Sequence, residues 1–243
     1  MEGKNFWVAF WSSAIPFALR PGVLVAFTNS RSANKLTLSL PEGEFQAYIF
    51  DCDGTIADSM PLHYIAWRNA LAPWNCDFTE SLFYEWAGFS VTEIVRMLNE
   101  KHGLKMPVED VVRRKEEIYF QSLPDLKAVP EVLEHINTNY GRIPFAVVSG
   151  STRDSVTSSL RSLGLAEKFE ILVCAGDYKK GKPDPEPFLL AAALLGVKPQ
   201  SCLVFEDSEM GIAAARAAGM ASVKVPPPRE GHSADQTTAD SSQ

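Results

Sequence analysis

The stretch "YIFDCDGTIADS", from Tyr48 to Ser59, decides how the rest of the sequence is interpreted. Three apolar residues lead into Asp51, and a second carboxylate, Asp53, follows two residues later. Two like charges at this spacing repel each other, so they lie either at a surface turn or in a site that holds them together for chemistry. A turn explains Asp51 poorly, because this residue directly follows a run that is typical of a buried strand. We therefore expect both carboxylates at the carboxyl end of a strand.

Apolar runs of this kind recur along the chain and alternate with helical patterns. Near-continuous β-branched and aromatic runs predict strands over 47–51, 143–149, 171–174, 202–206 and 221–225. The spacing of apolar residues predicts helices over 152–163, 185–195 and 209–218, with Gly219 closing the last. Because strands that are apolar on both faces suit a parallel sheet, the alternation predicts an α/β fold with a doubly wound, Rossmann-like parallel sheet.

Residues 59–124 break this alternation. Their apolar residues have helical spacing throughout, and no run there is typical of a strand. Thr79 and Ser90 are typical helix starts, and Ser90 with Glu93 matches a capping box. We therefore predict an inserted all-helical domain at 59–124, with a catalytic core formed by 43–58 and 125–226.

The two ends of the chain differ from this core. Residues 1–42 are predicted to be an N-terminal extension, and 227–243, rich in Pro, Ser and Thr, a disordered tail. The first forty residues carry four basic side chains, five serines and one acid, which is the profile of an organelle transit peptide. The alternative is an extension without function, or a translation start placed too far upstream. The expected location is cytoplasmic, or a plastid or mitochondrion if the extension is a transit peptide.

Composition limits the partners that we expect. The net charge of −7 over 243 residues does not suit a general nucleic-acid binder. No apolar run reaches the roughly 18 residues of a membrane-spanning helix, so no membrane partner is expected either. The four widely spaced cysteines form no CxxC pair and are interpreted as reduced thiols. We expect a monomer that acts on a small molecule.

Further polar residues follow other predicted strands. Ser149 ends the second strand, and Glu206 and Asp207 end the fourth. Because the carboxyl ends of parallel strands meet at one edge, these side chains are expected beside Asp51, where open α/β sheets bind ligands. Lys182, in the loop "GDYKKGKPDPEPF", is expected to bring a positive charge to the same crevice.

The loop that holds Lys182 also resembles a nucleotide-binding P-loop in part. Gly176 and Gly181-Lys182 match the pattern G-x-x-x-x-G-K. The next residue is Pro183, however, where a P-loop needs Ser or Thr to bind magnesium, and proline has no N–H to offer a phosphate. We therefore reject the P-loop interpretation.

These groups together suit phosphoryl transfer. Carboxylates at the strand ends can bind Mg²⁺, and Lys182, Ser149 and the start of helix 152–163 can hold a phosphate. One carboxylate can attack phosphorus and form an aspartyl-phosphate. A second, two residues further along an extended chain, lies on the same side and can protonate the leaving alcohol and then activate water.

Four segments carry a family resemblance. "DCDGTIADS", "VVSGS", "KKGKPDPEPF" and "FEDSEMGIAAARAAGM" resemble, in order, the four motifs of the haloacid dehalogenase superfamily, over roughly residues 45–225. Their spacing is similar to that of its β-phosphoglucomutase-like, sugar-phosphate phosphatase branch. The resemblance implies a nucleophile at Asp51, a general acid/base at Asp53, and phosphoryl-binding groups at Ser149 and Lys182. It also implies Mg²⁺ bound by Asp51, the backbone carbonyl of Asp53 and Asp207, with Glu206 near the metal.

The resemblance further implies that residues 59–124 form a cap over the site. The substrate-binding candidates are His63, twelve residues after the nucleophile, and Trp67, Gly88, Ser90, Lys115, Gly150, Ser151 and Arg153. Structural alternatives remain open for three of them. His63 could be a helix-surface residue, Trp67 part of the core of the cap, and Lys115 part of a solvated charged face.

The predicted function is a Mg²⁺-dependent phosphatase of a small phosphorylated metabolite, most simply a sugar phosphate. One alternative is a phosphosugar mutase of the β-phosphoglucomutase type. Mutases of this branch resemble one another in an Arg directly after the G-x-S of the cap, where this chain has Val91. Arg96 lies more than a helical turn further on, and Arg153 could substitute in part. His63 and Lys115 also keep the mutase alternative open. A non-catalytic binding protein would not need both a nucleophile and an acid/base. A dehalogenase would need neither Asp53 nor a metal.

Overall fold

The computed structural model describes residues 38–227. Most of the predicted extension (1–42) and nearly all of the predicted tail (227–243) therefore lie outside the described residues. Within them, Leu38 and Leu40 pack against buried side chains of the core, so the packed structure begins before residue 43, where we expected it. No helix in this part of the chain is both long enough and apolar enough to cross a membrane.

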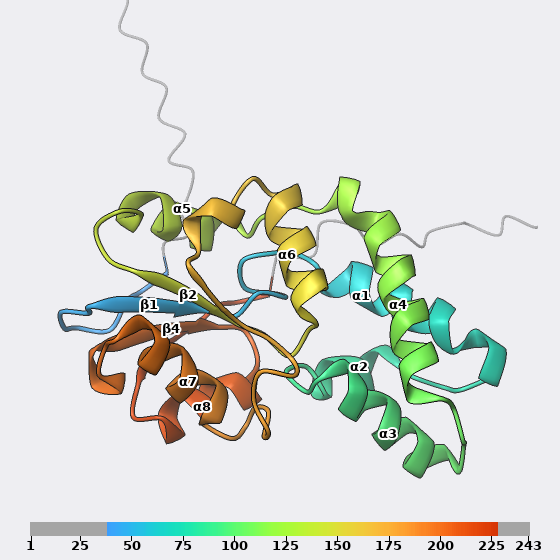
Figure 1. Ribbon diagram of the computed structural model, residues 1–243. Coiled ribbons are helices and arrows are strands. Elements are labelled where there is room, and N and C mark those ends of the chain that lie inside the picture. The colour runs from blue at the N-terminus through green and yellow to red at the C-terminus, as the bar shows by residue number, and fades with distance from the viewer. Residues whose placement is uncertain (1–37, 228–243) are drawn as a thin grey trace, which may run out of the picture. The chain divides into compact units, whose positions relative to one another are not determined.

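A parallel sheet forms the centre of the core (Figure 1). Its five strands are ordered β3-β2-β1-β4-β5, and every neighbouring pair is parallel. The strands are β1 (Ala47–Phe50), β2 (Phe145–Val148), β3 (Ile171–Val173), β4 (Cys202–Glu206) and β5 (Ala221–Lys224). The predicted doubly wound α/β fold is confirmed, and β1 occupies the middle of the sheet.

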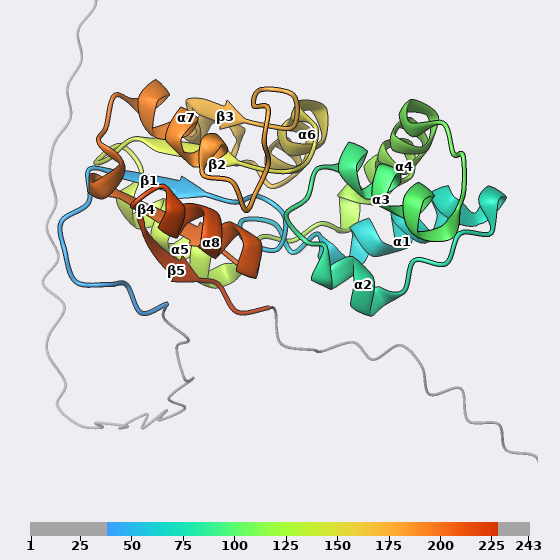
Figure 2. The ribbon, with the colours of Figure 1, turned by 90° about the horizontal axis from the view of Figure 1, so that it is seen from below.

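Helices cover both faces of this sheet (Figures 1 and 2). They are α5 (Pro130–Asn139), α6 (Arg153–Ser162), α7 (Glu186–Leu195) and α8 (Glu209–Ala217). Short 3₁₀ turns, Ala166–Lys168 and Pro199–Ser201, precede β3 and β4. Three of the four helices match predicted ones, whereas α5 was not predicted. Gly219, with φ 73°, follows α8 in the left-handed conformation expected of a helix-terminating glycine.

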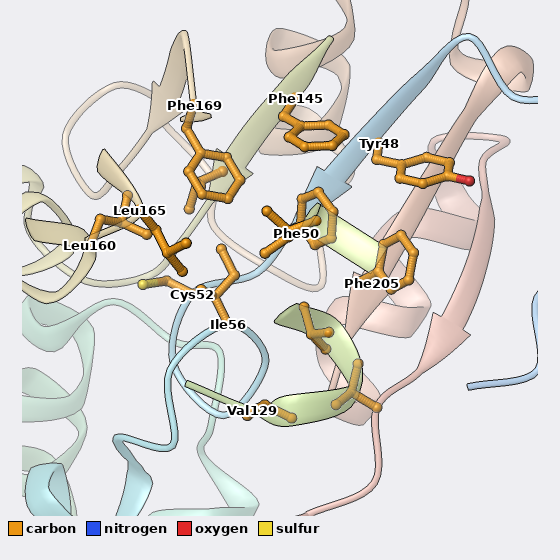
Figure 3. Close-up of a cluster of buried hydrophobic side chains, with 14 of the residues drawn as sticks. Tyr48, Phe50, Cys52, Ile56, Val129, Phe145, Leu160, Leu165, Phe169 and Phe205 are labelled. Atoms are coloured by element: carbon orange, nitrogen blue, oxygen red, sulfur yellow. The ribbon is translucent and has the colours of Figure 1, made fainter. Parts of the chain in front are cut away.

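Alternate strand residues divide between two buried clusters, because successive side chains of a strand point to opposite faces. Tyr48 and Phe50 face α5 and α6, where Phe50 stacks on Phe205 with ring centroids 4.7 Å apart (Figure 3). Ala47 and Ile49 face α7 and α8. Both faces of β1 are thus buried, which explains why its sequence is apolar throughout.

The predicted helical insertion is present and forms its own hydrophobic cluster. It contains α1 (Met60–Leu71), α2 (Glu80–Glu85), α3 (Val91–His102) and α4 (Val108–Ser122), with 3₁₀ turns at Ala72–Trp74 and Leu123–Asp125. Thr79 caps α2 by accepting a hydrogen bond from Leu82, and Ser90 and Glu93 form the expected capping box of α3. Figure 2 shows these helices beyond the carboxyl ends of the strands, which places them over the candidate site.

Candidate active site

Asp51 lies directly after the central strand. Its backbone N–H donates to the carbonyl of Phe205 (2.9 Å), which extends the pairing of β1 with β4 by one residue. The chain then turns sharply at Gly54, where φ is +86°. A Cβ at this position would overlap the Asp207 carboxylate, so the turn both needs a glycine for its conformation and brings two motifs into contact.

Lys182 is the buried cation of the site. Its Nζ donates to Asp51 Oδ1 (2.6 Å), to Glu206 Oε2 (2.7 Å) and to the Val148 carbonyl (3.1 Å). Burial alone would lower the pKa of this lysine, but the Asp51 and Glu206 carboxylates hold it above its ordinary value. The ammonium is therefore charged at neutral pH and orients the predicted nucleophile.

Three carboxylates lie close together beside this ammonium. Oxygens of Asp51, Glu206 and Asp207 all lie within 4.8 Å of one another. Burial raises the pKa of Asp51 despite Lys182, and burial together with Glu206 raises the pKa of Asp207 to about 7. This excess of buried negative charge, supplied entirely by oxygen donors, fits a hard divalent cation. The residues present thus suit a metal ion, which would neutralise phosphoryl oxygens when bound.

Hydrogen bonds orient the two acidic residues at the end of β4 differently. Thr55 donates its hydroxyl to Asp207 Oδ1 (3.1 Å). Glu206 uses Oε2 for Lys182 and accepts at Oε1 from the backbone N–H and the hydroxyl of Ser208. Both Glu206 oxygens are therefore engaged within the protein, so Glu206 is placed as the partner of Lys182 beside the predicted metal site.

Asp53 has a different set of partners from Asp51. Its Oδ1 accepts from Ser59 Oγ (2.7 Å) and lies 2.8 Å from His63 Nε2, and its Oδ2 accepts from Ser151 Oγ (2.6 Å). Ser149 Oγ is 3.5 Å from the same Oδ2. Burial acts to raise the pKa of Asp53, but His63 and the two serine hydroxyls hold it below its usual range. Asp53 is therefore a fixed carboxylate at the side of the site that faces the cap.

His63 links the cap to this carboxylate. It lies on α1 and is 4% exposed, so the alternative of a helix-surface residue does not describe it. Burial and the nearby Lys115 lower its pKa, while Asp53 opposes this effect. The imidazole is therefore neutral at pH 7, and Nε2 carries the proton that it donates to Asp53.

One pocket is lined by both the core and the cap. Eleven of the predicted site residues line it: Asp51, Asp53, His63, Trp67, Gly88, Lys115, Ser149, Gly150, Ser151, Glu206 and Asp207. The cap adds apolar side chains that were not among the predicted substrate-binding residues, namely Met60, Phe83, Trp86, Phe89, Val91 and Ile94. Lys182 lies behind Asp51 and reaches the pocket through its contact with that carboxylate.

Lys115 and Trp67 are both buried residues of the cap. Lys115 is 1% exposed, and its Nζ lies 3.0 Å from Glu116 Oε1, so it does not belong to a solvated face. Trp67 belongs to the hydrophobic cluster of the cap and also lines the pocket. Trp67 is therefore both part of the core of the cap and a residue of the pocket wall.

Two predicted substrate-binding residues have other partners. The Arg153 guanidinium donates to the Leu172 carbonyl (3.0 Å) and to Asp177 (2.6 Å), and Arg153 is not among the described residues that line the pocket. Ser90 is engaged in the capping box, although its neighbours Phe89 and Val91 line the pocket.

Sequence reasoning missed several partners of the catalytic candidates. Ser59, Thr55 and Ser208 hold carboxylates, and Tyr178 donates its hydroxyl to the Ser149 carbonyl (3.1 Å). Thr55 and Ser208 each lie within two residues of a predicted site residue, which was a usable signal. Tyr178 is far from Ser149 in sequence, and only the fold brings it there.

Comparisons with known proteins identify the family. Residues 48–225 match the haloacid dehalogenase-like hydrolases. The chain belongs to this family. It is 35% identical over 181 residues to fructose-1-phosphate phosphatase YqaB of Escherichia coli, covering 74% of this chain and 96% of that protein. It is 32% identical over 179 residues to a phosphorylated carbohydrates phosphatase of Thermotoga maritima, covering 72% and 82%.

A solved structure agrees with this assignment. The crystal structure of β-phosphoglucomutase from Clostridium difficile superimposes with a TM-score of 0.66 at 30% identity, covering 73% of this chain and 83% of that one. The predicted resemblance to the β-phosphoglucomutase-like, sugar-phosphate phosphatase branch is confirmed. The protein is a haloacid dehalogenase-like phosphatase by family.

Proposed function

We propose that this phosphatase hydrolyses a small sugar phosphate with Mg²⁺, through an aspartyl-phosphate on Asp51. The observation that carries the proposal is the separation of the two aspartates: Asp51 contacts Lys182, whereas Asp53 contacts Ser59, Ser151 and His63. Asp51, beside Lys182 and the carboxylates that could hold a metal, is the proposed nucleophile, and Asp53, on the side of the site that faces the cap and the leaving group, is the proposed acid/base.

The proposed reaction has two steps. In the first, a carboxylate oxygen of Asp51 bonds to phosphorus, the bond from phosphorus to the leaving oxygen breaks, and Asp53 gives that oxygen a proton. Asp53 is a carboxylate in the free protein and gains this proton when the substrate binds, because the negative charge of the phosphate raises its pKa. In the second, water attacks phosphorus, Asp53 takes the proton of the water, and the bond to Asp51 breaks to release phosphate. Mg²⁺ is the proposed metal, and Asp51, the backbone carbonyl of Asp53 and Asp207 would hold it, near Glu206. Lys182 keeps Asp51 in place throughout.

The cap side of the pocket supports a sugar as leaving group. Trp67, Trp86 and Phe89 offer aromatic surface, against which the apolar faces of a sugar ring can pack. Lys115 supplies a polar group for hydroxyls. The names of two relatives agree with this class, since they act on fructose 1-phosphate and on phosphorylated carbohydrates.

A panel of phosphate monoesters tests the proposal directly. The purified protein with Mg²⁺ is expected to release phosphate from at least one hexose or pentose phosphate faster than from nucleotides, and EDTA is expected to stop the release. Turnover of nucleotides alone would refute the substrate class. No turnover of any ester with Mg²⁺ present would refute the proposed activity.

A phosphosugar mutase remains the second candidate, because a β-phosphoglucomutase has a similar structure and Lys115 places a cation at the pocket. A mutase must also hold the second phosphate of a bisphosphate. Val91 offers no charge there, Arg96 is exposed on α3, and Arg153 pairs with Asp177. We therefore expect release of phosphate without a bisphosphate activator. Interconversion of glucose 1- and 6-phosphates that is faster than phosphate release would favour the mutase.

A further inference from the structure

Tyr119 is a fully buried residue of α4 that lies behind the site. Its ring stacks on His63, with centroids 3.9 Å apart and planes 18° apart. Its hydroxyl lies 2.8 Å from Ser159 Oγ on α6, and Ser159 in turn donates to the backbone carbonyl of Ser155 (2.9 Å). Tyr119 is not one of the described residues that line the pocket, so it has no direct route to a bound substrate.

His63 depends on this stack for its orientation. The terminal torsion of a histidine side chain has broad minima, so packing decides where its ring nitrogens point. Within the described residues, His63 Nδ1 has no hydrogen-bond partner, so no bond at that nitrogen fixes the ring. The ring is therefore held by its contact with Asp53 at Nε2 (2.8 Å) and by the face of Tyr119.

The phenol of Tyr119 is in turn anchored in the core. Ser159 is fully buried on α6, a helix that packs on the sheet, whereas Tyr119 and His63 both belong to the cap. The hydrogen bond from Tyr119 to Ser159 thus fixes a side chain of the cap to a helix of the core.

We propose that Tyr119, held by Ser159, is a positioning residue that fixes His63 and thereby the carboxylate of Asp53. This inference rests on the proposed function, because it assigns Tyr119 a role only if Asp53 is the acid/base. A carboxylate that rotates away from the reacting oxygen loses proton-transfer efficiency steeply, since proton transfer requires contact within hydrogen-bond distance. Tyr119 therefore affects the chemical steps, although it touches neither substrate nor metal.

The alternative is that the same bond only joins the cap to the core. The two roles predict different kinetics. A loosened cap weakens substrate binding and raises KM, and it slows both steps of the reaction together. A misplaced Asp53 lowers kcat and slows most those steps that need a proton to move.

Tyr119→Phe removes the hydroxyl and keeps the stacking ring, and Ser159→Ala removes the same hydrogen bond from the other side. Tyr140→Phe is the matched control, because the Tyr140 hydroxyl also bonds to another segment, at the Glu167 carbonyl (3.3 Å), away from the pocket. With the best sugar phosphate, both test variants are expected to lose kcat by about fivefold, the usual effect of one net hydrogen bond, with KM unchanged. The control is expected to match the wild type.

Rapid mixing with p-nitrophenyl phosphate separates the steps. Because p-nitrophenolate leaves without a proton at neutral pH, forming the aspartyl-phosphate from this ester does not need Asp53, whereas its hydrolysis does. The test variants are therefore expected to show a larger burst of p-nitrophenol than the wild type. In the His63→Gln background, adding Tyr119→Phe is expected to lower kcat no further, because Tyr119 acts through His63.

The possible failures can be told apart. A wild-type protein that hydrolyses no ester would refute the proposed function and this inference with it. An active wild type whose Tyr119→Phe and Ser159→Ala variants keep kcat, or change only KM, would refute the inference alone. Circular dichroism checks that each variant is folded, and Ser159→Ala replaces Tyr119→Phe if the latter does not fold.

Discussion

Asp51 and Asp53 are two residues apart, yet their side chains meet different partners. Lys182 holds Asp51, while serine hydroxyls and His63 hold Asp53. Asp51→Asn is expected to abolish the trapped phosphoenzyme, because an amide is not a nucleophile for phosphorus. Asp53→Asn is expected to leave the fold intact and slow turnover by at least about 10²-fold, the usual effect of losing a general acid/base. Acid-quench trapping and phosphate release measure the two effects. Equal and mild effects would show that the roles are wrongly assigned.

Gly211 on α8 lies against the side chain of Glu206. A Cβ there would overlap the Glu206 carboxylate, which accepts a hydrogen bond from the Lys182 ammonium. Gly211→Ala is therefore expected to lower the free energy of unfolding by about 2 kcal/mol, the scale of overpacking, and to reduce turnover at least tenfold. Urea denaturation and phosphate release measure both.

The other end of α8 offers a control for that substitution. Gly219 has φ 73°, and no atom lies closer than 3.7 Å to a Cβ placed there. Gly219→Ala is expected to lower stability by about 1–2 kcal/mol through backbone strain, with turnover retained. If both variants lost turnover equally, the effect would come from stability and not from the position of Glu206.

At the scale of elements, the sequence predicted all five strands and three of the four core helices. The expected strands were generally longer than the observed ones, because polar residues such as Asp51 and Ser149 directly follow the apolar run and were counted with it, although they already belong to the site. Helix α5 was missed because Pro130 begins it without a side-chain cap at Val129, so its start has no polar signal. Its buried face is also narrow, with Val132 and Ile136 as its buried residues.

Ser90 was predicted to bind substrate, and it is observed to cap helix α3. Ser90→Ala is expected to lower the free energy of unfolding by about 1 kcal/mol, with KM unchanged. Thr79→Ala, at the start of α2 and away from the pocket lining, removes a similar cap and is the matched control. A rise in KM for Ser90→Ala that Thr79→Ala does not share would show that Ser90 contacts the substrate after all.

At the scale of the whole molecule, the motifs predicted which residues lie together at the site. They did not predict which partner each side chain contacts. The carboxyl ends of neighbouring parallel strands had to bring Asp51, Ser149 and Asp207 together once the fold was known. Arg153 follows Ser149 by only four residues, yet it turns to Asp177, which comes from the loop after β3. The apolar residues that line the pocket could not be predicted from the sequence either. Residues such as Phe83 and Ile94 have the helical spacing of residues that pack in a hydrophobic core.

The balance of charge in the whole site predicts how stability depends on pH and on metal. Without metal, the pKa of Asp207 is about 7 in the folded protein, against 3.8 ordinarily, because of burial and then Glu206. The folded state therefore holds this proton more tightly than the unfolded state. The contribution of Asp207 to stability is present below about pH 4 and is lost as pH rises toward 7. In EDTA, the free energy of unfolding of the wild type relative to Asp207→Asn is expected to fall across this range.

Urea denaturation of both proteins at several pH values measures this difference. His63 and His135 have lowered pKa values and act in the opposite direction, but both are present in each protein and cancel in the comparison. Above pH 7, Mg²⁺ is expected to raise the melting temperature of the wild type, because a ligand that binds only the folded state stabilises it. The same addition is expected to do less at pH 5, where protons compete for Asp207, and little in Asp207→Asn. A difference that stays flat from pH 4 to 8 would mean that Asp207 titrates as an ordinary carboxylate and is not held among buried like charges.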